Sequence, residues 1–366
     1  MPRMRRVMSS APVGVVLSLA VAGTALGLSW SGRIPLTSSG NGFGDGIDQL
    51  DASSAVMSFV EWNGDGYNVG VRRSTTSGTS WDSPQILSTN GFDSDVAALS
   101  PYVDVVFEQN NRVRYVRSVN DGASYGPPMA LSPKSRAFPI NLSVARGPGG
   151  LVVVAWQNGN TNVVKVRVST DNGVSFGSTT NFATNIQDEG TAVAAGNGVV
   201  YLAYKTEFDT LMVTRSTNGG VNWDPPVTAT TSAYSVVDEF SLAAAGDHVY
   251  LAYSNINTAH PAWGTVRYRR SLDSGQTWSN ERQLSPAAWK TEHPQIDLRN
   301  GVLRAVYGRR TSSGISIYFQ KSNDGLNWGG AQLVDPNAHD PFVTYAGKVI
   351  VLFEVGTGNA YVRTGS

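Results

Sequence analysis

The chain has no cysteine among its 366 residues. Disulfide bonds, thiolate metal sites, cysteine nucleophiles and lipoprotein acylation are therefore excluded. Charge is scarce as well, because only 15% of the residues are charged and 28 basic side chains balance 28 acidic ones. A neutral chain offers no electrostatic footprint for nucleic acid or an anionic membrane. The four histidines lack zinc-binding spacing and no aspartate-rich calcium loop occurs, so neither a metal nor another cofactor is predicted.

The N-terminal segment differs from the rest of the chain. Residues 1–6 are basic, and no further charged residue occurs before Arg33. The apolar stretch between them has small residues around Ala22 and Ala25, which suit a signal peptidase. Residues 1–30 are therefore predicted to be a signal peptide or, if uncleaved, an anchor, because residues 11–28 are about long enough to span a bilayer. Either alternative predicts a secreted or cell-surface domain over residues 33–366.

A turn motif recurs six times in that domain. Each copy has a short polar residue, a glycine two positions later and an aromatic residue three positions after the glycine. The polar side chain can bond to nearby backbone, glycine supplies a positive φ, and the aromatic ring can bury one face. The copies lie at 74–81, 118–125, 169–176, 216–223, 271–278 and 321–328, with polar residues Thr76, Asn120, Asp171, Asn218, Asp273 and Asn323. The residues assigned a structural role in these turns are Asp171, Asp273, Gly173, Gly275, Trp223 and Trp278.

Apolar runs upstream of these turns recur seven times rather than six. They end at residues 61, 108, 157, 205, 254, 308 and 354. Each unit has room for four strands, and four strands every 40 to 50 residues are typical of a β-propeller. The last unit lacks a fourth strand, while residues 33–42 resemble residues 84–91, the fourth strand of an earlier unit. The sequence therefore predicts an all-β, seven-bladed propeller of four-stranded antiparallel blades, in which an N-terminal strand joins the last blade.

The repeated Ser-x-Asp-x-Gly-x-x-Trp pattern, as at 271–278, is an Asp box. On this motif the chain resembles the sialidase (neuraminidase) superfamily of Asp-box, or BNR-repeat, propellers. Sialidases have six blades, which is the alternative to the seven counted here. The resemblance implies three arginines that hold a substrate carboxylate, a tyrosine–glutamate nucleophile and an aspartate acid/base. The candidates for catalytic residues are Arg33 of Arg-Ile-Pro, Asp65 before the first box, Glu189 or Glu239, and Arg309 or Arg310.

The sequence departs from the sialidase pattern at two places. Lys205 or Ser254 stands where the resemblance implies the second arginine, which removes the bidentate grip on a carboxylate. The tyrosine implied before the last apolar run is also missing there, although Tyr345 lies nearby. If Arg33 lies in the closing strand, its match to the motif is chance. The predicted function is therefore a non-catalytic, exported binding protein for a glycan or a protein surface, and the alternative is a divergent exo-α-sialidase-like glycoside hydrolase.

Topology assigns the loops to two faces of the propeller. The crossing face carries the blade-to-blade connections and the loops between second and third strands, whereas the box face carries the six turns. Trp263 and Trp289 fall in irregular segments on the crossing face, where aromatic rings can stack on sugars. A monomer is expected, with membrane contact only through an uncleaved anchor. The predicted ligand-binding residues on the crossing face are Trp263, Trp289, His293, Asp340 and Glu354.

Overall fold

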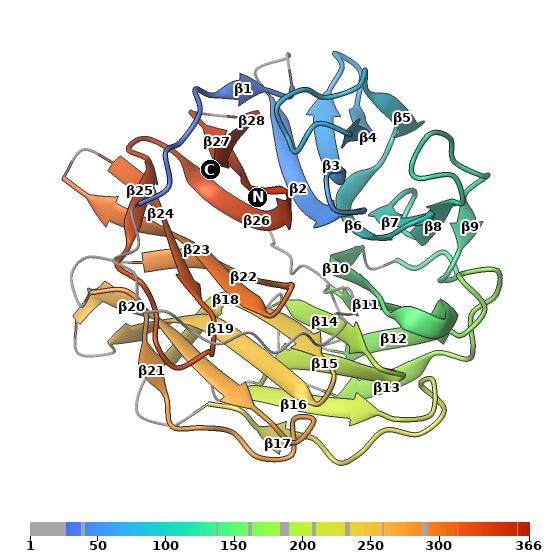
Figure 1. Cartoon of the computed structure of the whole chain (residues 1–366). Helices are drawn as coiled ribbons and strands as arrows, with labels where there is room; N and C mark the ends of the chain where they lie inside the picture. The colour runs from blue at the N-terminus through green and yellow to red at the C-terminus, as the bar shows by residue number, and fades with distance from the viewer. Residues whose placement is uncertain are drawn as a thin grey trace.

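The computed structural model describes residues 27–37, 41–136, 138–159, 163–183, 190–206, 210–230, 235–257, 260–286, 291–312, 314–356 and 358–366, without the side chains of 183, 235–238, 256–257 and 260–263. Within these ranges the chain forms seven four-stranded antiparallel sheets and one 3₁₀ turn, η1 (Pro148–Gly150). Figure 1 shows the sheets as blades around a ring. The prediction of a seven-bladed, all-β propeller is confirmed, and the six-bladed alternative is wrong.

Blades 1 to 6 are each built from four strands that follow one another in the sequence. The first strands of neighbouring blades contact one another around the whole ring, so they form its inner wall. Blades 1 to 3 comprise β2 (Gly42–Gln49), β3 (Ala55–Trp62), β4 (Tyr67–Ser74) and β5 (Gln85–Ser88); β6 (Phe92–Leu99), β7 (Tyr102–Glu108), β8 (Val113–Ser118) and β9 (Met129–Ala130); and β10 (Pro139–Arg146), β11 (Val152–Asn158), β12 (Val163–Ser169) and β13 (Thr180–Ala183). Blades 4 to 6 comprise β14 (Thr191–Gly196), β15 (Val199–Lys205), β16 (Leu211–Ser216) and β17 (Val227–Thr228); β18 (Ser235–Ala245), β19 (His248–Asn257), β20 (His260–Ser271) and β21 (Arg282–Gln283); and β22 (Thr291–Arg299), β23 (Val302–Thr311), β24 (Gly314–Ser322) and β25 (Gln332–Asp335).

Blade 7 joins the two ends of the described chain. It contains β26 (His339–Ala346), β27 (Lys348–Val355) and β28 (Asn359–Gly365), and its outer strand is β1 (Ile34–Pro35). Ile34 pairs with Val362 in antiparallel register, and β1 lies beside β28 in Figure 1. The predicted closure by an N-terminal strand is therefore present, and it covers a sheet edge that would otherwise be open.

The hydrophobic core is divided into seven clusters, one between each pair of neighbouring blades. Strand β7 shows why the apolar runs are continuous. Val105 and Phe107 pack in the cluster shared with blade 1, whereas Val106 packs in the cluster shared with blade 3. Since successive side chains of a strand point to opposite faces, a strand buried on both faces is apolar at most positions.

The six predicted turns share one hydrogen-bond pattern, which the copy at 271–278 illustrates. The Gly275 N–H donates to the Ser271 hydroxyl oxygen at 2.8 Å, and Asp273 accepts hydrogen bonds from Ser271 and Thr277. Trp278 packs against the core between blades 4 and 5. In the sixth copy the carboxylate of Asp324 accepts these hydrogen bonds, and not the predicted Asn323. Its glycine lies three residues after the serine of the turn, Ser322, whereas Gly275 lies four residues after Ser271.

Trp30 supplies blade 7 with the aromatic residue that its own sequence lacks. It packs against the core between blades 6 and 7, with its ring edge-on to Phe319 at a centroid distance of 5.6 Å. It forms a β-bridge with Gly365, the last residue of β28, just as Trp328 bridges Ser322 at the end of β24. The packed part of the propeller therefore includes Trp30, which the predicted division of the chain had assigned to the N-terminal segment.

Arginines on the third strands link neighbouring blades on the box face. Each donates to a backbone carbonyl in the turn of the following blade, as Arg117 does to Asn172 O at 2.8 Å. These bonds tie successive blades together outside their apolar cores. The equivalent bonds run from Arg73 to Asp121, Arg215 to Ser274 and Arg270 to Asp324.

Candidate functional site

The inner strands reach the crossing face through β-bulges. Register shifts interrupt the pairing of β18, β22 and β26 with their neighbours close to their first residues. Within these bulges His293 and Asp340 have φ values of 56° and 60°. A bulge re-aims a side chain away from its regular alternation in the ladder. The bulges therefore place polar residues of successive blades side by side at the mouth of the ring.

Five side chains from blades 5, 6 and 7 meet there, and we call them the mouth cluster: Glu239, His293, His339, Asp340 and Glu354. Glu239 Oε2 accepts the backbone N–H of His293 at 2.5 Å, and Glu239 Oε1 lies 2.5 Å from His293 Nδ1. His293 Nε2 lies 3.3 Å from Asp340 Oδ1. His339 Nδ1 lies 3.1 Å from Asp340 Oδ2 and 3.9 Å from Glu354 Oε2. Carboxylates and imidazoles thus alternate along a continuous chain.

The mouth cluster is largely shielded from water. Asp340 and Glu354 have side chains only 8% and 4% exposed, whereas His339 is 28% exposed. Three carboxylates and two imidazoles make up the cluster. Its open side, at His339, therefore offers polar groups, chiefly carboxylate acceptors, to a ligand.

Carboxylates that accept a backbone N–H of the next blade also occur in blades 1 and 2. Asp45 of blade 1 accepts the backbone N–H of Ser94 at 3.2 Å, and Asp93 of blade 2 accepts that of Leu142 at 3.3 Å. Glu239 makes the same kind of bond to the next blade, so linking blades accounts for its position. That role does not account for the imidazole of His339 beside Glu354, which is directly opposite it in the β26–β27 register.

The arginines proposed for a sialidase-like site do not converge on the mouth cluster. Arg33 adjoins the outer strand β1 and donates two hydrogen bonds to Asp335, from Nε at 2.8 Å and from Nη2 at 2.6 Å. This ion pair raises the pKa of Arg33 and gives the side chain a structural role at the ring's outer edge. A catalytic role would require Arg33 and Asp65 to converge on one pocket, and no described contact joins them.

The other two candidate arginines are also engaged. Arg309 lies over the ring of Tyr318, with its guanidinium carbon 5.8 Å from the ring centroid. Arg310 is half-exposed and lies 4.0 Å from the buried carboxylate of Glu292. No described contact therefore joins Arg309 or Arg310 to the mouth cluster, so neither lies there to hold a carboxylate.

The remaining predicted site residues are not joined to the cluster. Asp65 is exposed in the hairpin turn between β3 and β4, where its N–H donates to Asn63 Oδ1. Glu189 and Trp289 lie outside the described residues. Trp263 falls within β20, but its side chain is not described. The structure therefore brings together Glu239, His293, Asp340 and Glu354 of the predicted residues and adds His339, which precedes Asp340 at the start of β26.

A second charged network lies deeper along the inner wall. Arg299 of β22 reaches past blade 7 to pair with Asp48 of β2, and both side chains are almost fully buried. Burial raises the pKa of Asp48 to about 6, although the positive charge of Arg299 opposes the shift. Arg304 lies 4.1 Å from the ring centroid of Tyr345 in the same region. Because these groups are paired and enclosed within the inner wall, they are not available to a ligand.

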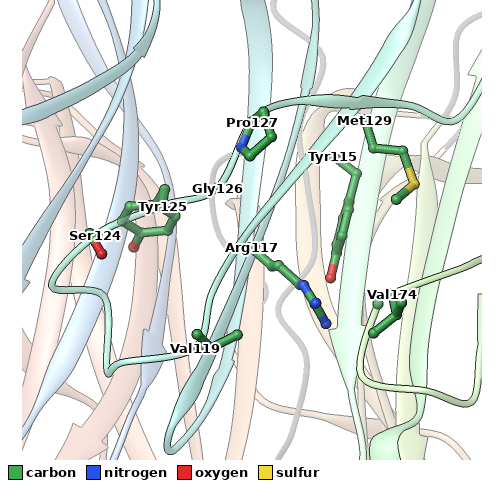
Figure 2. A pocket seen from close by; sticks show the side chains of 10 residues that line it. Tyr115, Arg117, Val119, Ser124, Tyr125, Gly126, Pro127, Met129 and Val174 are labelled. Carbon is green, nitrogen blue, oxygen red and sulfur yellow. The ribbon is translucent and has the colours of Figure 1, made fainter.

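A groove of about 470 Å³ lies between the outer part of blade 2 and the turn of blade 3. Figure 2 shows Tyr115 and Arg117 next to each other among the residues that line it, with Val174 near the ends of both side chains. Both polar groups are already bonded, since the Tyr115 hydroxyl donates to Asp104 and Arg117 donates to Asn172 O. Exposed Val119 and Val174 make its rim apolar. The mouth cluster is therefore the better candidate for a polar ligand.

Comparison with known proteins supports the fold. No protein-family model matches the chain, and no curated protein matches its sequence. Among solved structures, a sialidase of Trypanosoma rangeli in complex with sialic acid is similar at 12% identity and a TM-score of 0.53, over 86% of this chain and 60% of the sialidase. The Hadza microbial sialidase Hz136 is similar at 16% identity and a TM-score of 0.50, over 72% of this chain and 62% of its own length. A Dyadobacter fermentans protein of unknown function is similar at 12% identity and a TM-score of 0.53, over 93% of this chain and all of that protein.

These similarities establish a sialidase-like propeller fold. At such identities they carry no information on the chemistry of the site. No helix in the described ranges is long and apolar enough to cross a membrane.

Proposed function

We propose that this protein is an exported, non-catalytic binding propeller that takes an uncharged, hydroxyl-rich glycan at the mouth cluster. The observation that carries the proposal is the convergence of five ionisable side chains from three successive blades on the crossing face. Sugar hydroxyls donate to carboxylates, and sites of this kind use a few fixed polar groups to orient the ligand. The rigid inner strands supply that fixed geometry.

The charge of the cluster sets the expected specificity. Glu239, Asp340 and Glu354 present only acceptors, so a sugar carboxylate such as that of sialic acid would meet like charge. A neutral sugar or an amino sugar avoids this repulsion. The proposal therefore predicts that the protein prefers uncharged or amino-substituted glycans to sialylated ones.

Binding to a glycan array tests this function. The Asp340→Asn variant should lose most of the binding, because one acceptor becomes a partial donor and the charge between His293 and His339 disappears. Asp224→Asn is the matched control, since Asp224 forms an exposed ion pair with Arg215 on the box face. Binding restricted to sialylated glycans, or equal loss in both variants, would contradict the proposal.

The alternative is a divergent glycoside hydrolase that uses Asp65 with Glu239. The sialidase-like fold is its support, and exposed Asp65 is its candidate acid/base. It predicts turnover of a fluorogenic sialoside that Asp65→Asn abolishes. Turnover with that sensitivity would replace the binding function, and intact sialoside with retained array binding would remove the alternative.

The exported location is part of the same proposal. The basic and apolar residues 1–25 support it as an export signal, although they lie outside the described residues. Expression of the full chain followed by fractionation should recover the propeller outside the cytoplasm. Deletion of residues 2–25 should leave it inside, and unchanged fractionation after this deletion would contradict the export signal.

A further inference from the structure

Three ligand atoms of the mouth cluster lie close enough together to share one cation. A ring nitrogen of His339, a carboxylate oxygen of Asp340 and a carboxylate oxygen of Glu354 all lie within 4.8 Å of one another. The histidine nitrogen is 3.1 Å from Asp340 Oδ2 and 3.9 Å from Glu354 Oε2. Ligand atoms bound about 2.1 Å from a tetrahedral zinc ion lie about 3.4 Å from one another. The observed separations bracket this value, so a cation needs only small side-chain adjustments.

The surroundings of His339 orient its ring for such a role. Its Nε2 lies 3.0 Å from the carbonyl oxygen of Gly356 and can donate to it. In the neutral ring this bond leaves the lone pair on Nδ1, the nitrogen that faces the two carboxylates. Metal-binding histidines commonly donate their second nitrogen to a backbone carbonyl in this way, which fixes the tautomer and the ring orientation.

Asp340 is supported from the opposite side. While its Oδ2 faces His339, its Oδ1 lies 3.3 Å from His293 Nε2, and His293 is held in turn by Glu239 at 2.5 Å. The backbone of His339 pairs directly with Glu354 in neighbouring strands. All three donor groups therefore sit on paired strands or a bulge of blade 7, and a neighbouring blade orients one of them.

We propose that His339, Asp340 and Glu354 form a binding site for a divalent transition-metal cation of the zinc class, with His293 and Glu239 as its outer support. One imidazole and two carboxylates suit Zn²⁺ better than Ca²⁺, which prefers six to eight oxygen ligands. Three protein ligands leave a fourth position, on the side where His339 is 28% exposed. A water molecule or a ligand hydroxyl fits that position. The site coincides with that of the proposed function, but its test needs no glycan.

Titration of the chelator-treated full chain with ZnCl₂, followed by calorimetry and thermal unfolding, tests this site. The wild type should bind one equivalent of Zn²⁺ and melt at a higher temperature with it, while CaCl₂ at the same concentration should have little effect. His339→Gln removes a ligand from a partly exposed position and should weaken Zn²⁺ binding by about 100-fold or more. His293→Gln should weaken it about 10- to 100-fold, as loss of outer support does.

His248→Gln is the matched control, because His248 is exposed at the start of β19, on the box face. It should bind Zn²⁺ as the wild type does. The metal site would be overturned by absence of binding at millimolar Zn²⁺, by wild-type affinity in His339→Gln, or by equal losses in His248→Gln. Unchanged melting of the metal-free His339→Gln variant shows that it folds. Zn²⁺ binding without any array ligand would overturn the glycan proposal and leave this one standing.

Discussion

Replacement of Trp30 by alanine tests how the ring is closed. Trp30 is half-buried against the core between blades 6 and 7 and lies edge-on to Phe319. Loss of about 100 Å² of buried apolar surface costs roughly 2.5 kcal/mol at about 25 cal/mol per Å². The lost aromatic pair adds about 1 kcal/mol. We therefore expect Trp30→Ala to lower the free energy of unfolding by about 3 to 4 kcal/mol.

Thermal unfolding followed by far-UV circular dichroism measures this loss. At about 2 °C per kcal/mol for a chain of this size, the Tm should fall by about 7 °C. Trp328→Ala should cost a similar amount, because Trp328 holds the corresponding position between blades 5 and 6. Trp30→Phe should cost less than half as much as Trp30→Ala, since Phe176 packs at the equivalent position between blades 2 and 3.

Phe138→Ala provides the control for removing an aromatic side chain, because Phe138 is 61% exposed. Its Tm should stay within about 2 °C of the wild type. If Trp30→Ala were as mild as Phe138→Ala, or if Trp328→Ala were far more severe than Trp30→Ala, the equivalence of the two tryptophans would be refuted.

Three further predictions concern other parts of the ring. Burial raises the pKa of Asp48 to about 6, above the unfolded value of about 3.9, so its contribution to stability is full below pH 4 and is lost as the pH rises through 6. The Tm difference between wild type and Asp48→Asn should therefore shrink between pH 4 and pH 7, and the loss in free energy of unfolding is at most about 3 kcal/mol. Gly173→Ala should lower the free energy of unfolding in urea by about 1 to 3 kcal/mol, much more than Gly149→Ala. Both glycines have φ above 70°, but of the two only Gly173 has a neighbour that a Cβ would meet, the Tyr115 hydroxyl oxygen. Arg33→Ala should cost about 2 kcal/mol of stability in the same assay and leave array binding unchanged; lost binding at full stability would return Arg33 to the site.

The sequence predicted the fold well because the propeller repeats one unit. Spacing of the apolar runs revealed seven blades, and the missing last strand pointed to closure by the N-terminus. The packing of Trp30 was not predicted, because it lies in the segment assigned to export. A signal was nevertheless present: every fourth strand begins four residues after the aromatic residue of its turn, as Gln85 follows Trp81, and Ile34 follows Trp30 at the same distance.

The candidate site was only partly predictable. Topology placed His293, Asp340 and Glu354 on one face, since each lies at the crossing end of a strand. Their contacts depend on bulges that turn His293 and Asp340 out of the regular ladder, and the apolar pattern contains no signal for a bulge. Likewise, Arg33 carried a family motif, but its partner Asp335 is distant in sequence and adjacent only once the ring has closed.

The pairing of β1 with β28 also imposes an order on events during synthesis. Of the described strands, β1 comes first in the chain, and it pairs with β28, which comes last. Blades 1 to 6 can assemble one after another from local segments, while residues 27–37 must wait for β28. Until then the apolar surface of blade 1 that packs against blade 7 lacks its cover. The ring can therefore be completed only after β28 has emerged from the ribosome.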